Sequence, residues 1–106
     1  MTFELFETDP FKEDIAHLHP PAADRVRRKI SDYLPENATS KACGYLGGRY
    51  RQYRRLRVGD YRVMFTVCYE CRQRKLQVEV GCESCPGKPG NSVVLQFVRK
   101  REDAYE

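Results

Sequence analysis

The sequence has no long hydrophobic run. In these 106 residues, no apolar stretch approaches the roughly 18 consecutive residues that a transmembrane helix needs. The longest apolar-rich segment, residues 93–98, has the length of a β-strand. The first ten residues carry Glu4, Glu7 and Asp9 where a secretory signal would have a basic and then an apolar region. We therefore expect no membrane association and a cytoplasmic location.

Internal repeats and low-complexity tails are also missing. The hydrophobic share of 41%, with 11% aromatic residues, is ordinary for a folded protein, so a collagen-like or wholly disordered chain is excluded. The length suits one hydrophobic core and is too short for two full domains, which predicts a single domain over residues 1–106. His17 and His19, the two histidines, lie at a predicted helix junction, and we assign them no catalytic role.

The first half of the chain predicts a strand and two helices. Residues 2–8 alternate as a short strand does. Asp9 and Pro10 suit a helix start, with Asp9 as the cap, and a buried stripe follows at helical spacing. A second helix starts near Pro21 and ends at Pro35, and polar residues 36–48 form an exposed loop. The predicted buried stripes of the two helices are Phe11, Ile15 and Leu18, then Val26, Ile30, Tyr33 and Leu34.

The second half predicts strands. Residues 50–58 and 61–67 are two β-rich runs joined by the turn signal Gly59-Asp60, which indicates an antiparallel hairpin. Residues 75–80 and 92–98 are two further candidate strands, separated by a segment rich in glycine and proline. The predicted fold class is α+β, with the N-terminal strand and helix pair packed on one face of an antiparallel sheet.

Acidic residues are scarce in the hairpin. The net charge is +4, and between positions 49 and 75 only Asp60 and Glu70 are acidic. Strand periodicity places four side chains together on the exposed face of the sheet, whereas Arg54 falls on the core side, which suggests a sheet edge or a bulge. Guanidinium groups beside an aromatic ring suit phosphates and bases, although a simple solvated face fits equally well. The four exposed residues are Tyr53, Arg55, Arg57 and Arg62.

Three motifs follow one another along the chain: YLGG at 45–48, YRRLRVGDYRVMF at 53–65 and RKREDAY at 99–105. Together they resemble the RelE/ParE toxin superfamily. That family has a leucine-glycine loop, an arginine-rich strand with a valine-glycine-aspartate-tyrosine-arginine turn, and a basic C-terminal segment ending in tyrosine. The resemblance implies a RelE-like fold, a toxin neutralised by a RelB-like antitoxin, and, in the RelE branch, cleavage of mRNA on the ribosome without a metal.

The resemblance also implies roles for individual residues. The RNA 2′-hydroxyl attacks its own phosphorus and leaves a 2′,3′-cyclic phosphate, so the site must stabilise negative charge and move protons. Tyr53 stands where some members have a lysine that acts as base, which leaves the base unassigned. The implied catalytic residues are Arg55, Arg62, Arg99 or Arg101, and Tyr105, and the implied RNA-binding residues are Arg51, Tyr53, Arg54 and Arg57.

Four cysteines form two Cys-x-x-Cys pairs. Ten residues separate Cys71 from Cys82, and two such pairs are typical of a tetrahedral zinc site, here expected to be structural because all four positions are filled. The toxin family lacks these cysteines, so we interpret residues 68–90 as a zinc-knuckle insertion between late strands. Disulfides or reduced thiols are the alternatives. Cys43 stands alone and is assigned no role. The expected ligands are Cys68, Cys71, Cys82 and Cys85.

Three functions follow from these patterns. The first is a ribosome-dependent mRNA endonuclease, whose partners are an antitoxin, the ribosome and mRNA. The second is a ParE-like inhibitor that binds DNA gyrase without cleaving anything. The third is a non-toxic RNA- or protein-binding module on the same scaffold. One fold supports all three, so the choice depends on the site.

Overall fold

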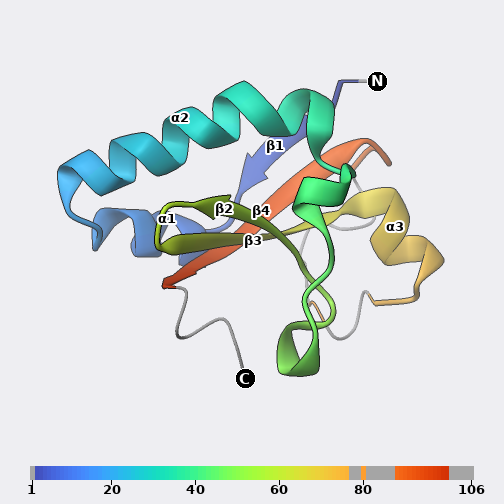
Figure 1. Ribbon diagram of the computed structural model, residues 1–106. Helices are drawn as coiled ribbons and strands as arrows, with labels where there is room; N and C mark the ends of the chain where they lie inside the picture. The colour runs from blue at the N-terminus through green and yellow to red at the C-terminus, as the bar shows by residue number, and fades with distance from the viewer. Residues whose placement is uncertain (1, 77–79, 81–87, 101–106) are drawn as a thin grey trace.

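The computed structural model describes residues 2–76, 80 and 88–100. It confirms the predicted α+β class, with the helices and strands arranged as in Figure 1. No helix within these residues is both long enough and apolar enough to cross a membrane. The elements are β1 (Glu4–Glu7), α1 (Asp9–Ala16), α2 (Pro20–Asn37), the 3-10 turns η1 (Lys41–Cys43) and η2 (Gly48–Tyr50), β2 (Arg54–Val58), β3 (Tyr61–Val67), α3 (Cys68–Gln73) and β4 (Ser92–Lys100).

The four strands form one mixed sheet in the order β1-β4-β3-β2. The hairpin β2–β3 and the pair β3–β4 are antiparallel, as expected, but β1 runs parallel to β4. The prediction of a wholly antiparallel sheet was therefore wrong. Alternation along a strand indicates which side chains share a face, but it does not indicate the direction of the neighbouring strand.

Both helices begin near the predicted positions. The cap of α1 is Thr8 rather than Asp9: the Thr8 hydroxyl accepts a hydrogen bond of 3.2 Å from the Phe11 amide. The α2 helix starts at two prolines, as predicted, but continues past Pro35 to Asn37. Pro35 lies in the last turn of α2, where it donates no backbone hydrogen bond, and its carbonyl accepts a hydrogen bond of 2.7 Å from the Phe3 amide.

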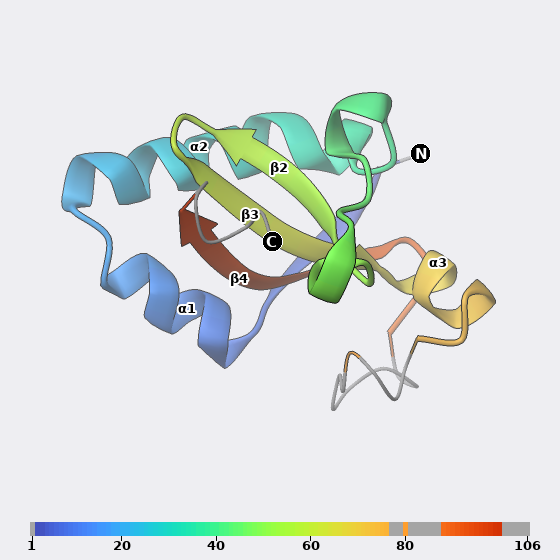
Figure 2. The ribbon, with the colours of Figure 1, turned by 60° about the horizontal axis from the view of Figure 1, so that its bottom comes forward.

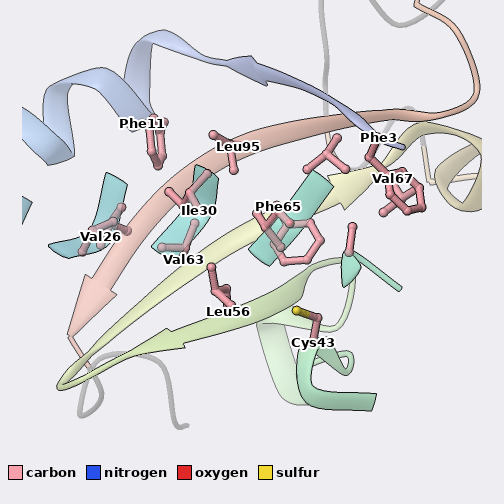
Figure 3. Close-up of a cluster of buried hydrophobic side chains, with 14 of the residues drawn as sticks. Phe3, Phe11, Val26, Ile30, Cys43, Leu56, Val63, Phe65, Val67 and Leu95 are labelled. Atoms are coloured by element: carbon pink, nitrogen blue, oxygen red, sulfur yellow. The ribbon is translucent and has the colours of Figure 1, made fainter. Parts of the chain in front are cut away.

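The hydrophobic core lies between the helices and one face of the sheet (Figure 3). The apolar stripes of α1 and α2 supply one side of it, and alternate residues of the strands supply the other. The segment 36–48, predicted to be an exposed loop, also contributes to this core, because Ala38 and Cys43 are completely buried in it. The buried members include Phe11, Val26, Ile30, Leu34, Leu56, Val63, Phe65, Val67 and Leu95.

A short helix follows the hairpin, before the segment 75–80 that was expected to form a strand. The chain leaves β3 directly into α3, and Lys75 then has a φ of 56°, which no strand residue adopts. The Val80 amide donates to the Leu76 carbonyl over 2.9 Å, a helical pattern. The prediction of a strand over 75–80 was therefore wrong for the residues that the structure describes there. The α3 helix carries Cys68 and Cys71, both buried, whereas Cys82 and Cys85 lie outside the described residues.

Candidate nucleic-acid interface

One face of the sheet is not covered by α1 or α2. Figure 2 shows this face towards the viewer, with α2 behind the sheet and η2 in front of it. Three arginines from three neighbouring strands stand opposite one another here, because Arg57 pairs with Arg62 and Arg62 pairs with Arg99 in the strand register. Directly opposed residues of adjacent strands point to the same side. We call Arg57, Arg62 and Arg99 the arginine row.

The middle arginine of the row is buried. Arg62 is only 4% exposed, and its Nη1 donates hydrogen bonds of 3.0 and 2.9 Å to the carbonyl oxygens of Gly59 and Tyr61. The prediction placed Arg62 on this face correctly but expected it to be exposed, which is wrong. Arg62 lies on an inner strand between two neighbours, and its side chain turns back to the hairpin turn. Arg57, on the outer strand, is exposed.

Arg99 at the other end of the row is held by α1. Its Nη1 lies 2.9 Å from Oδ2 of Asp14 and 2.9 Å from the Val98 carbonyl oxygen. The Arg99 guanidinium also lies over the ring of Phe97, with its carbon 4.6 Å from the ring centroid. This stack is a cation–π arrangement. The Arg99 side chain is 38% exposed, so it reaches solvent while its orientation is constrained.

An aromatic cluster adjoins the arginine row. The Phe97 ring lies 4.9 Å from the Tyr53 ring, in an edge-to-face arrangement, and 5.8 Å from the Tyr50 ring. Met64 and Leu46 are buried beneath these rings. Of these three rings, the sequence pattern indicates Tyr53 alone, because residues 93–98 are apolar at almost every position and so give no alternation from which to place Phe97.

The remaining predicted residues of the hairpin have different surroundings. Arg55 pairs with Met64 in the register, is half-buried, and donates from Nη1 to the Gly44 carbonyl over 3.2 Å. Arg51 is exposed just after η2, and its carbonyl accepts from Arg74 over 3.4 Å. These arginines lie beside the cluster without joining the row.

Arg54 lies on the opposite face, on the core side as its register predicts. Its Nε and Nη2 each donate over 2.7 Å to the Glu70 carboxylate, and its Nη1 donates to the Cys43 carbonyl over 2.8 Å. The Tyr45 hydroxyl adds a hydrogen bond of 2.9 Å to the same carboxylate. Burial opposes ionisation of Glu70, but the hydrogen bonds from Arg54 and Tyr45 outweigh it and lower the Glu70 pKa. The hydrogen bond to Glu70 raises the pKa of Arg54.

Two groups of predicted residues fall outside the described residues, in whole or in part. Arg101 and Tyr105 are not described. Of the four expected zinc ligands, Cys68 and Cys71 are described and lie three residues apart on α3. No group of three or more potential metal-ligating side chains occurs within the described part of the chain. The assignment of the four cysteines to zinc therefore stays a prediction.

Comparison with known proteins identifies the architecture. No protein family model matches the chain, and no curated protein sequence matches it. The fold, however, is similar to that of a chain in the crystal structure of the toxin–antitoxin complex RelBE2 from Mycobacterium tuberculosis, with a TM-score of 0.68. The match covers 95% of this chain and 93% of that chain. The protein has a RelE-like fold. At 16% sequence identity, this similarity concerns the fold, and the RelE-like fold alone does not assign an activity.

Proposed function

We propose that the protein is the toxin of a toxin–antitoxin pair and that it cleaves mRNA on the ribosome. The observation that carries this proposal is the arginine row beside the aromatic cluster, on the face of the sheet that α1 and α2 leave uncovered. Guanidinium groups bind phosphates and aromatic rings stack on unpaired bases, so this face suits a single-stranded RNA. The RelE-like fold and the three sequence motifs agree with it.

The proposed reaction is an intramolecular transesterification. The RNA 2′-oxygen forms a bond to the adjacent phosphorus, the bond from phosphorus to the 5′-oxygen breaks, and the products are a 2′,3′-cyclic phosphate and a 5′-hydroxyl. Arg57 and Arg99 would offset the charge that develops on the phosphate oxygens. Arginine has a pKa above about 12, so it stabilises charge better than it donates protons. Water or ribosomal RNA would move the protons, together with Tyr105.

We propose an antitoxin as the protein partner. The comparison structure is a toxin–antitoxin complex, and the uncovered face here carries several positive side chains. A segment with acidic side chains that folds on binding would neutralise them and cover the aromatic cluster. In this arrangement the antitoxin and the mRNA compete for the same face.

The test is primer extension on a reporter mRNA in a reconstituted translation reaction. We expect new cuts at A-site codons with the wild-type protein, at least tenfold fewer with Arg57→Ala, and no change with Arg28→Ala. Arg28 is the matched control because it is an exposed arginine on the outer side of α2. Intact mRNA together with inhibited DNA supercoiling would contradict the nuclease and support gyrase inhibition. Intact mRNA and normal supercoiling would contradict both toxin activities and support a non-toxic binding module.

We also propose that Cys68, Cys71, Cys82 and Cys85 hold one structural zinc ion. Thiolates in two Cys-x-x-Cys pairs are the donor set that zinc prefers, and the first pair lies on one short helix with both side chains buried. We expect close to one zinc per chain in protein purified without chelator. Substitution Cys68→Ser should abolish this zinc, whereas Cys43→Ser should retain it. Absence of zinc and iron from the wild-type protein would contradict the site.

A further inference from the structure

One carboxylate oxygen connects α1 to the end of the arginine row. Oδ2 of Asp14 accepts a hydrogen bond of 2.9 Å from the Val98 amide and another of 2.9 Å from Nη1 of Arg99. The first contact anchors the carboxylate to the backbone of β4, and the second anchors the guanidinium to the carboxylate. The Asp14 side chain is 29% exposed, so this anchor is partly shielded from water.

The anchor uses only one of the three nitrogens of Arg99. Nη1 makes both hydrogen bonds of the side chain, to Asp14 and to the Val98 carbonyl. Within the described residues, Nε and Nη2 of Arg99 make no hydrogen bond, and the plane is supported by the Phe97 ring at 4.6 Å. A guanidinium can bind a phosphate bidentately through Nη1 and Nη2 or through Nε and Nη2. Because Nη1 of Arg99 is already occupied, the edge formed by Nε and Nη2 is the one that remains for a phosphate.

We propose that Asp14 is a positioning residue, which fixes Arg99 so that this edge receives a backbone phosphate of single-stranded RNA. The proposal rests on the function proposed above and adds a residue from α1, which no motif indicates. A flexible surface arginine loses side-chain freedom when it binds, and fixing it beforehand removes part of that loss. Asp14 thus improves binding although its own charge repels the ligand.

The sign of the effect of removing the Asp14 charge distinguishes a positioning role from a general electrostatic effect. Removing any acidic residue raises the net charge and, by charge alone, strengthens binding to RNA. If Asp14 positions Arg99, its replacement must weaken binding instead. Glu13 is the matched control, because it is an exposed acid next to Asp14 on α1 and makes no ion pair among the described residues.

The experiment measures binding of a short fluorescein-labelled single-stranded RNA by anisotropy at two salt concentrations. We expect Asp14→Asn to weaken binding about fivefold to tenfold, and Glu13→Gln to leave it unchanged or slightly tighter. Asp14→Asn keeps an acceptor for the Val98 amide, so the fold should persist, which thermal unfolding checks. In an Arg99→Lys protein, which lacks the bidentate edge, Asp14→Asn should have almost no further effect.

A second measurement follows Arg99 directly. The Nε–H signal of Arg99 in ¹⁵N-labelled protein should show a rigid side chain in the wild type and a mobile one in Asp14→Asn, a change that a purely structural role for Asp14 would not produce. Equal RNA affinities for Asp14→Asn and Glu13→Gln, or an Arg99 signal that does not change, would overturn the positioning role. A wild-type protein that binds no RNA would overturn the assigned ligand.

The two proposals fail in different ways. The wild-type protein could bind RNA with the expected dependence on Asp14 and yet leave mRNA intact on the ribosome. This result would contradict the proposed nuclease activity and support the positioning role of Asp14. Equal mRNA cleavage by the Asp14→Asn and Glu13→Gln variants would support the nuclease activity and contradict the positioning role.

Discussion

Arg54 on β2 and Glu70 on α3 form a bidentate ion pair, with two N–O distances of 2.7 Å. The two side chains are 12% and 15% exposed, so this pair is largely shielded from solvent. The guanidinium carbon of Arg54 also lies 4.5 Å from the ring centroid of Tyr45, and that of Arg74 lies 4.0 Å from it. These contacts join the helix that carries Cys68 and Cys71 to the edge of the sheet.

We predict that Arg54→Ala lowers the free energy of unfolding by about 2–4 kcal/mol, because it leaves the Glu70 carboxylate shielded without its main partner. Arg27→Ala should cost less than about 1 kcal/mol, since the Arg27–Glu7 pair is exposed, with side chains 47% and 32% accessible. Urea unfolding of both variants checks the comparison. Equal losses for the two would show that the Arg54 pair is no stronger than a surface pair.

A second prediction separates the members of the arginine row. Arg62→Ala should lower the free energy of unfolding by about 1–3 kcal/mol, because the carbonyls of Gly59 and Tyr61 lose a charged donor. Arg57→Ala should change it by less than about 0.5 kcal/mol, since that side chain is exposed. Both variants should lose mRNA cleavage. Thermal and urea unfolding give the stabilities, and a stable Arg62→Ala protein would contradict the buried role of Arg62.

A third prediction concerns the aromatic cluster. Phe97 contacts Tyr50, Tyr53 and Arg99, so Phe97→Ala should destabilise the protein by about 2–4 kcal/mol and weaken RNA binding. Phe6→Ala is the control: Phe6 belongs to β1, is 37% exposed and lies outside the cluster, and its removal should cost less than about 1 kcal/mol. Urea unfolding measures both, and similar losses would show that the Phe97 ring contacts contribute little.

Local patterns predicted the elements that depend on local chemistry. The hairpin turn at Gly59 is as expected, because Gly59 has a φ of 58°. The buried stripe Val26, Ile30 and Leu34 of α2 is also confirmed. By contrast, β1 and β4 pair although they lie near opposite ends of the sequence, and nothing in either segment indicates that they are parallel.

The site was predicted only in part, for a physical reason. Register places Arg57 and Arg62 on one face, and periodicity is sufficient for that. Burial of Arg62 depends on the neighbouring strands, and the contact of Arg99 with Asp14 joins residues 85 positions apart. The beginning of α3 was missed because Cys-x-x-Cys spacing indicated a metal ribbon instead of a helical turn.

The last prediction concerns alkaline pH and Cys43. Burial raises the pKa of the Cys43 thiol above its ordinary value of 9.0, and this outweighs the opposing effects of the Ser40 hydrogen bond and the nearby positive charges. Above that value the unfolded chain releases the thiol proton more readily than the folded protein does, so the folded state binds more protons. Stability must then fall as pH rises through the unfolded pKa.

The free energy of unfolding should decrease, because of this one thiol, by up to about 1.4 kcal/mol per pH unit until the pH reaches the pKa of the folded state. Urea unfolding at about pH 8 and about pH 10 measures it. Cys43→Ala should be less stable than the wild type at both pH values, because it leaves a cavity in the core. Between the lower and the higher pH, however, it should lose less stability than the wild type does. Burial also raises the pKa of Tyr45, which is present in both proteins, so its contribution cancels in the comparison. The same decrease in both proteins would show that Cys43 ionises equally well in the folded and unfolded states.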